Sequence, residues 1–153
     1  MDTIKEAKIH LRENFNKGTS CPCCGQFVKL YKRRLYSSQA AALIHVWKKF
    51  GQEWFHKNNI SEKKILIMIS GGDFAKLRYW GLVVEQENIE TEKRASGIWR
   101  VTEFGENFAL NKFKVKSHIL LYNQKFIGFD GEDIDIYESL GNKFNYQELM
   151  QTT

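Results

Sequence analysis

The segment Ser70–Leu110 constrains the fold more than any other part of the chain, because its pattern predicts five elements in a fixed order. The first is a helix in which Phe74, Leu77 and Trp80 recur at helical spacing and therefore face a core. Gly81 closes this helix, since glycine readily adopts the left-handed conformation that follows many helix ends. The segment thus begins with a short helix that has one buried face and one free face.

A β-hairpin and another helix complete the segment. Leu82–Val84 and Ile98–Val101 are apolar, and the polar run 85–97 between them predicts a hairpin tip. Thr102 is a good N-cap for the helix that follows. Upstream, periodicity alone cannot assign Lys63–Ser70 to helix or strand. Its position before a Gly-Gly turn and another helix favours a helix, which gives a helix-turn-helix.

A recognition helix followed by a β-wing has this order of elements. The outer face of the helix and the hairpin tip hold five candidate nucleic-acid-binding residues, which are Lys76, Arg78, Tyr79, Lys93 and Arg94. The same tip also carries acid at Glu85, Glu87, Glu90 and Glu92, which is unfavourable beside phosphate. Protein contact therefore stays open as an alternative role for this scaffold.

Three cysteines lie within four residues, in the sequence Cys21-Pro22-Cys23-Cys24-Gly25. A Cys-Pro-X-Cys-Gly unit is typical of the turn of a zinc knuckle, in which backbone amides favour the thiolate of the first cysteine. The two-residue gap lets Cys21 and Cys24 converge on one ion, while Cys23 points away. A cytosolic compartment disfavours disulfides, so metal binding is preferred over pairing. A ribbon-like turn without metal is the alternative.

A tetrahedral zinc site needs four ligands, and the chain has no second Cys-X-X-Cys pair. A second chain could complete the site, as could one of five residues of the same chain, which are Cys23, His10, His45, His56 and His118. For His45 a helix-face or core position is the preferred interpretation, because it falls inside the predicted helix Gln39–Gly51.

A basic stretch follows the cysteines. Phe27–Tyr31 predicts a short strand that leads into Lys32, Arg33 and Arg34, which are candidate phosphate contacts with tyrosines on both sides for stacking. A solvated strand end is the alternative. Residues 3–16 before the cysteines predict an amphipathic helix. After the basic stretch, Ser37 or Ser38 caps the helix that begins at Gln39, and Trp47 and Trp54 are expected in the core.

The C-terminal part predicts strands. Residues 113–129 alternate apolar and polar positions, and Asn123-Gln124 stands where a tight hairpin turn belongs. An acidic turn is expected at Asp130–Asp133, followed by a third short strand with Ile134 and Ile136.

Charge is unevenly distributed along the chain. Net charge is +5, but residues 1–34 hold eight Lys/Arg against three acids, whereas residues 129–153 hold one Lys against six acids. The front and middle can therefore face a polyanion, and the tail cannot. No apolar run reaches membrane-spanning length and no secretory signal precedes the first helix, so we expect no membrane partner and a cytoplasmic location. The common phosphate-loop, serine-nucleophile and zinc-protease motifs are absent, so we expect no enzyme.

The sequences Lys-Leu-Arg-Tyr-Trp-Gly-Leu-Val and Gly-Ile-Trp-Arg-Val-Thr-Glu-Phe-Gly, separated by a polar gap, resemble the winged-helix pattern of small transcription regulators over residues 37–111. The whole chain resembles an uncharacterised family of bacteriophage and prophage proteins that pair a Cys-Pro-X-Cys-Gly knuckle with this pattern and an acidic C-terminal segment. The resemblance implies a phage context in a bacterial host and no particular activity.

The sequence therefore predicts an α+β fold with a winged helix-turn-helix core. Its expected parts are an N-terminal helix and zinc-ribbon-like cysteine knuckle (1–36), the winged-helix domain (37–112), and a β-hairpin appendage with an acidic C-terminal segment (113–153). The expected function is a DNA-binding regulator or accessory protein of phage origin, with double-stranded DNA as partner and zinc as candidate cofactor. The alternative is a protein–protein adaptor, for example a phage factor that binds and inhibits a host protein. Monomer and dimer both stay open.

Overall fold

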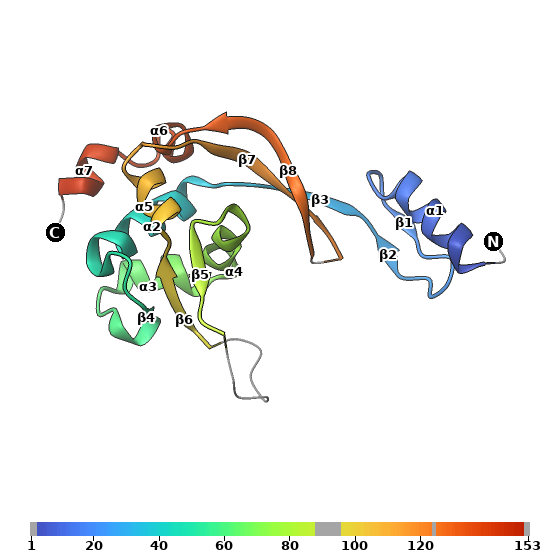
Figure 1. Ribbon diagram of the computed structural model, residues 1–153, viewed down its shortest axis with the longest axis horizontal. Helices are drawn as coiled ribbons and strands as arrows, with labels where there is room; N and C mark the ends of the chain where they lie inside the picture. The colour runs from blue at the N-terminus through green and yellow to red at the C-terminus, as the bar shows by residue number, and fades with distance from the viewer. Residues whose placement is uncertain (1–2, 88–95, 124, 152–153) are drawn as a thin grey trace. The chain divides into compact units, whose positions relative to one another are not determined.

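The computed structural model describes residues 3–87, 96–123 and 125–151. The chain divides into two compact units, which are residues 1–34 with 118–131 (unit 1) and residues 35–117 with 132–153 (unit 2). Helices and small antiparallel sheets are both present, so the fold class is α+β, as expected (Figure 1). The division cuts through the segment 113–153, which the sequence analysis treats as one part.

Unit 1 combines one helix with two short antiparallel sheets. Helix α1 begins after Thr3, whose hydroxyl accepts a hydrogen bond from the Glu6 amide at 3.1 Å. Strand β3 pairs with β7 from Leu30 opposite Tyr122 to Arg34 opposite His118, and β8 lies on the other side of β7. The elements of this part are α1 (Ile4–Asn14), β1 (Thr19–Ser20), β2 (Phe27–Val28), β3 (Leu30–Arg34), β7 (Val115–Tyr122) and β8 (Lys125–Ile134), of which β7 and β8 continue into unit 2.

Unit 2 contains most of the helices and a three-stranded antiparallel sheet in the order β4-β6-β5. In chain order its elements are α2 (Ser37–Phe50), β4 (Phe55–His56), η1 (Lys57–Asn59, a 3₁₀ turn), α3 (Lys63–Ser70), α4 (Gly72–Ala75), η2 (Lys76–Trp80, a 3₁₀ helix), β5 (Val83–Glu85), β6 (Ile98–Val101), α5 (Glu103–Ala109), α6 (Ile136–Leu140) and α7 (Tyr146–Gln151).

Helix α2 is the centre of the unit 2 core. Its side chains from Ala40 to Ile44 are fully buried, because the alanines let neighbouring helices approach closely. Helices α3, α5, α6 and α7 all pack against α2, and the β4–β6–β5 sheet lies beside them (Figure 1). The core of the described chain is therefore concentrated in unit 2.

Several local expectations are wrong. The N-cap of α2 is Tyr36, whose amide donates to Gln39 Oε1 at 2.7 Å, so Ser37 and Ser38 already lie inside the helix. Trp54 is 44% exposed and does not belong to the core. The acidic run Asp130–Asp133 forms part of β8, which extends to Ile134, so neither a turn nor a separate third strand exists there. Pairing with β7 keeps this polar stretch extended despite its low strand propensity.

His45 of α2 gives a pH-dependent contribution to the stability of unit 2. Its Nε2 is buried without a hydrogen-bond partner in the described structure, and burial, followed by the charges of Lys64 and Lys48, lowers its pKa. The native state thus favours the neutral ring, whereas the unfolded chain takes up a proton as pH falls through about 6.5. Stability should therefore decrease with falling pH in this range.

The substitution His45→Leu should remove this pH dependence, because leucine fills the site without an ionisable group. Urea unfolding followed by tryptophan fluorescence between about pH 7.5 and about pH 5.5 measures it, above the range in which carboxylates titrate. All four tryptophans lie in unit 2, so the signal reports that unit. An equal loss of stability in the variant and the wild type over this range would contradict the assignment to His45.

Candidate functional site

The segment α4–η2 carries three of the predicted nucleic-acid contacts, which are Lys76, Arg78 and Tyr79. One extended residue, Gly71, separates α3 from α4. Phe74, Leu77 and Trp80 are all buried, as the sequence predicts. Because a 3₁₀ helix has three residues per turn, residues three apart lie on the same face, so the switch from α4 to η2 keeps them aligned. Gly81, at φ 77°, ends the segment.

Four contacts fix α4–η2 on the rest of unit 2. The Phe74 ring lies 6.4 Å from the Phe55 ring and 5.6 Å from the Trp99 ring, measured between centroids. The buried Gln39 side chain donates from Nε2 to the backbone carbonyl of Asp73 at 2.7 Å. Trp80 donates from its indole N–H to the carbonyl of Lys116 at 2.7 Å. The segment is therefore held from both ends.

The outer face of η2 carries the three predicted contact residues. Arg78 is exposed, and its guanidinium lies over the Tyr79 ring at 5.0 Å, with Nη2 3.2 Å from the tyrosine hydroxyl. Lys76 forms an ion pair with Asp73 at 3.3 Å. Exposed pairs of this kind are weak, so a phosphate can compete for the lysine. Neither cation belongs to the buried face of the segment.

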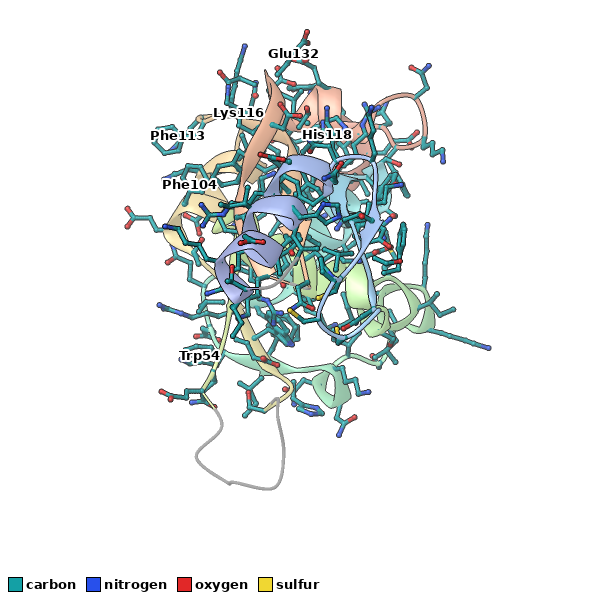
Figure 2. The ribbon with its side chains drawn as sticks, turned by 90° about the vertical axis from the view of Figure 1, so that its right-hand side faces the viewer. Trp54, Phe104, Phe113, Lys116, His118 and Glu132 are labelled. Atoms are coloured by element: carbon teal, nitrogen blue, oxygen red, sulfur yellow. The ribbon has the colours of Figure 1, made fainter. Side chains whose placement is uncertain are left out.

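The hairpin β5–β6 follows directly. At its base the exposed Trp54 ring lies under the guanidinium of Arg100 at 5.0 Å, in the position labelled in Figure 2. Ser96 donates to the carbonyl of Gln86 at 2.6 Å and closes the described part of the hairpin. The predicted contacts Lys93 and Arg94 lie outside the described residues.

The predicted basic triad lies in unit 1. Lys32, Arg33 and Arg34 all belong to β3 and are all exposed. Lys32 pairs with Asp130 of β8 at 2.8 Å, a hydrogen-bonded contact that lowers the pKa of the Asp130 carboxyl. Arg33 lies over the Tyr31 ring at 5.2 Å. The triad belongs to unit 1 and η2 belongs to unit 2, so each is described within its own unit.

The cysteine knuckle is a tight turn closed at both ends. The Cys21 amide donates to the Gln26 carbonyl at 2.7 Å, and the Gly25 amide donates to the Cys21 carbonyl at 2.8 Å, with Gly25 at φ 75°. The backbone amides of Cys24 and Cys23 donate toward the Cys21 sulfur and lower the pKa of its thiol. The amides of this turn therefore favour the thiolate form of Cys21.

The described residues contain no complete set of metal ligands around the knuckle. In the parts of the chain that the structure describes, no three His, Cys, Asp or Glu side chains are grouped closely enough to hold an ion. Cys21 and Cys24, the predicted ligands, both lie in this turn.

Sequence reasoning missed the exposed apolar surface of α3. Ile67 is 67% exposed, and none of the residues of this helix is fully buried. The signal was present, because five consecutive apolar residues, Ile65–Ile69, cannot all face one core at 100° per residue. A second exposed apolar contact is the stacked pair Phe104 and Phe113, whose centroids lie 5.5 Å apart (Figure 2).

Comparison with protein-family models, with curated proteins and with solved structures gives no match for this chain. Among the helices of the described residues, none is long and apolar enough to cross a membrane.

Proposed function

We propose that residues 37–112 form a winged helix-turn-helix that binds double-stranded DNA, in a regulator or accessory protein of phage origin acting in the cytoplasm of a bacterial host. The observation that carries the proposal is the position of α4–η2, which follows α3 after one residue and precedes the β5–β6 hairpin. Its inner residues are buried in the core, while Arg78 is exposed, with its guanidinium over the ring of the half-buried Tyr79.

In this proposal η2 enters the major groove. A guanidinium can donate two hydrogen bonds to the edge of a guanine, so Arg78 is the best candidate for a base contact. Lys76 contacts phosphate after leaving Asp73. Lys93 and Arg94 would touch the adjacent backbone from the wing, and Lys32, Arg33 and Arg34 would contribute further phosphate contacts from unit 1.

The double substitution Lys76→Ala with Arg78→Ala should weaken binding to random-sequence duplex DNA and flatten its salt dependence. Each lost phosphate contact reduces the slope of log affinity against log salt by about 0.9, so the expected decrease lies between about 1 and about 2. Fluorescence anisotropy over a salt series measures both quantities. Lys143→Ala is the matched control, since Lys143 is an exposed lysine of unit 2 in the acidic C-terminal segment.

Two results would contradict the DNA proposal. One is undetectable affinity of the wild-type protein at low salt. The other is an affinity that is independent of salt, because binding to phosphate must release counterions.

The exposed face of α3 favours a second candidate function, a protein–protein adaptor such as a phage factor that binds and inhibits a host protein. Burying Ile67, now 67% exposed, on a partner would stabilise a complex. The acidic residues Glu85 and Glu87 at the base of the wing also favour protein contact over phosphate. A host protein retained after nuclease treatment of a lysate, and lost with Ile67→Ser, would favour this function. Retention that depends on Arg78 and disappears with nuclease would favour DNA.

We propose in addition that Cys21 and Cys24 bind zinc as thiolates. The support is the Cys-Pro-X-Cys-Gly turn itself, in which the Cys24 and Cys23 amides donate toward the Cys21 sulfur. Such donors stabilise the negative charge that a zinc-bound thiolate retains. In this role the ion is structural, and it stabilises the fold of a unit with a small core.

A further inference from the structure

The knuckle of one chain supplies two ligands, and zinc requires four. Cys23 does not complete a third position, because in the part of the chain that the structure describes no three His, Cys, Asp or Glu side chains are grouped closely enough to hold an ion. Water molecules complete catalytic zinc sites, whereas structural sites are closed by protein ligands. The remaining two ligands must therefore come from carboxylates or histidines of the same chain, or from another chain, and among the described residues none of these groups forms a three-ligand cluster.

The four histidines of the chain all lie within the described residues, and their surroundings differ from one another. His10 Nε2 lies 3.1 Å from Thr19 Oγ1, with Nδ1 3.3 Å from Asn14. His45 Nε2 is buried, and His56 Nδ1 accepts a hydrogen bond from the Asn58 amide at 3.0 Å.

The last histidine, His118, lies in β7 beside the positive charges of Lys32 and Arg34. Those charges oppose a bound cation. Among the described residues, none of the four forms a three-ligand group with Cys21 and Cys24.

Unit 1 also has the burial pattern of a unit that needs a partner. Among its described residues, the buried apolar side chains are Ala7, Ile119 and Leu121. Seven large apolar side chains of the same unit are exposed, which are Ile4, Ile9, Phe27, Tyr31, Phe126, Ile127 and Phe129. Small units with so little core usually depend on a metal or on association. Phe27, at 60% exposure, lies in β2, the strand that follows the knuckle.

We infer that two copies of this chain share one zinc ion, with Cys21 and Cys24 of each copy forming a four-cysteine site between them. This inference rests on the proposed zinc binding and adds the source of the missing ligands. Four thiol protons pass to solvent as four zinc–sulfur bonds form, and the site carries a net charge of −2, from one Zn²⁺ and four thiolates.

The salt dependence of the inferred dimer should differ from the salt dependence of DNA binding. Unit 1 contains nine Lys/Arg and four Asp/Glu, a formal +5, so two such units repel each other except for the −2 of the shared site. Salt screens this repulsion. The zinc-bridged dimer should therefore tighten as salt rises, whereas DNA binding should weaken.

The test uses the full-length protein purified under reducing conditions. Zinc per chain is measured by elemental analysis, and molar mass by light scattering, before and after a chelator. The expected result is one zinc per two chains in a dimer, conversion to monomer on chelation, and return of the dimer when zinc is added back. The double variant Cys21→Ser with Cys24→Ser should be a zinc-free monomer, and Cys23→Ser should behave as wild type.

Cobalt titration of the chelated wild-type protein keeps the test valid if the double variant does not fold. Sulfur-to-cobalt charge-transfer absorption should saturate at one cobalt per two chains. Saturation at one metal per monomeric chain would overturn the shared site but leave zinc binding by the knuckle in place. Absence of metal binding would overturn both proposals about the knuckle. A dimer that survives chelation, or loss of the dimer in Cys23→Ser, would also overturn the shared site.

Discussion

Gly105→Ala is expected to destabilise unit 2 by about 3 kcal/mol, the upper end of the cost of overpacking a core. A Cβ at this position of α5 would overlap the carbonyl oxygen of Leu82 and lie 2.9 Å from the Leu82 carbonyl carbon and 3.0 Å from Val101 Cγ1. The Leu82 carbonyl cannot move freely, because it accepts a hydrogen bond from the Thr102 amide at 3.1 Å. Relief of the overlap therefore requires separating α5 from the start of the hairpin.

The midpoint of urea unfolding, followed by tryptophan fluorescence, measures this effect in unit 2. Gly72→Ala in α4 is the matched control, since a Cβ there meets nothing within 4 Å. Alanine favours helix over glycine by up to about 1 kcal/mol, so the control should be neutral or slightly stabilising. If Gly105→Ala were within about 0.5 kcal/mol of wild type, which is the range of a surface substitution, the close approach of α5 to Leu82 would be wrong.

Phe74→Ala is expected to cost about 3–5 kcal/mol, the usual range for a fully buried phenylalanine. Phe74 is 2% exposed and lies between the rings of Phe55 and Trp99. Phe55 in turn stacks on Phe50 of α2 at 4.7 Å. Truncating the side chain leaves a cavity under α4 and removes the aromatic contacts that join this segment to the sheet and to α2.

Phe113→Ala is the control for Phe74→Ala, because Phe113 is 48% exposed and its truncation leaves no internal cavity. It should cost about 1 kcal/mol or less, from lost stacking on Phe104. Phe74→Leu should cost less than Phe74→Ala, since it removes less volume. Equal small effects at residues 74 and 113 would contradict the burial of the α4–η2 segment.

The Phe74 series also tests the proposed DNA-binding role. Arg78 and Tyr79 are effective only if η2 is held rigidly, because a contact residue on a mobile support loses conformational entropy on binding. Under conditions in which Phe74→Leu remains folded by tryptophan fluorescence, a drop in DNA affinity without a change in salt slope would indicate mispositioning of η2 with its charges intact.

Local patterns in the sequence were sufficient for the elements that depend on local chemistry. The caps at Gly81 and Thr102, the buried spacing of Phe74, Leu77 and Trp80, and the alternation along β7 were all predicted and are confirmed. Each of these signals spans a few neighbouring residues, and its physical cause, a capped amide or one buried face, acts over the same distance.

Local patterns do not predict which strands pair when those strands are far apart in the sequence. The sequence does not show that β3 pairs with β7, nor that this pairing divides the C-terminal hairpin between two units. It also misplaced Trp54, because an aromatic residue is equally compatible with a core and with a surface stack on Arg100. The candidate basic residues were identified by type, but their assignment to unit 1 or unit 2 depends on which unit each strand or helix joins.

The sequence by itself therefore determined the helix–hairpin–helix order of residues 70–110 and the amide-rich turn at the cysteines, since both follow from short-range backbone preferences. Only the tertiary structure decided what those elements face. It left Ile67 of α3 and several large apolar side chains of unit 1 exposed. Burial depends on which segments, distant in the sequence, pack against a given face, and no local pattern specifies that packing.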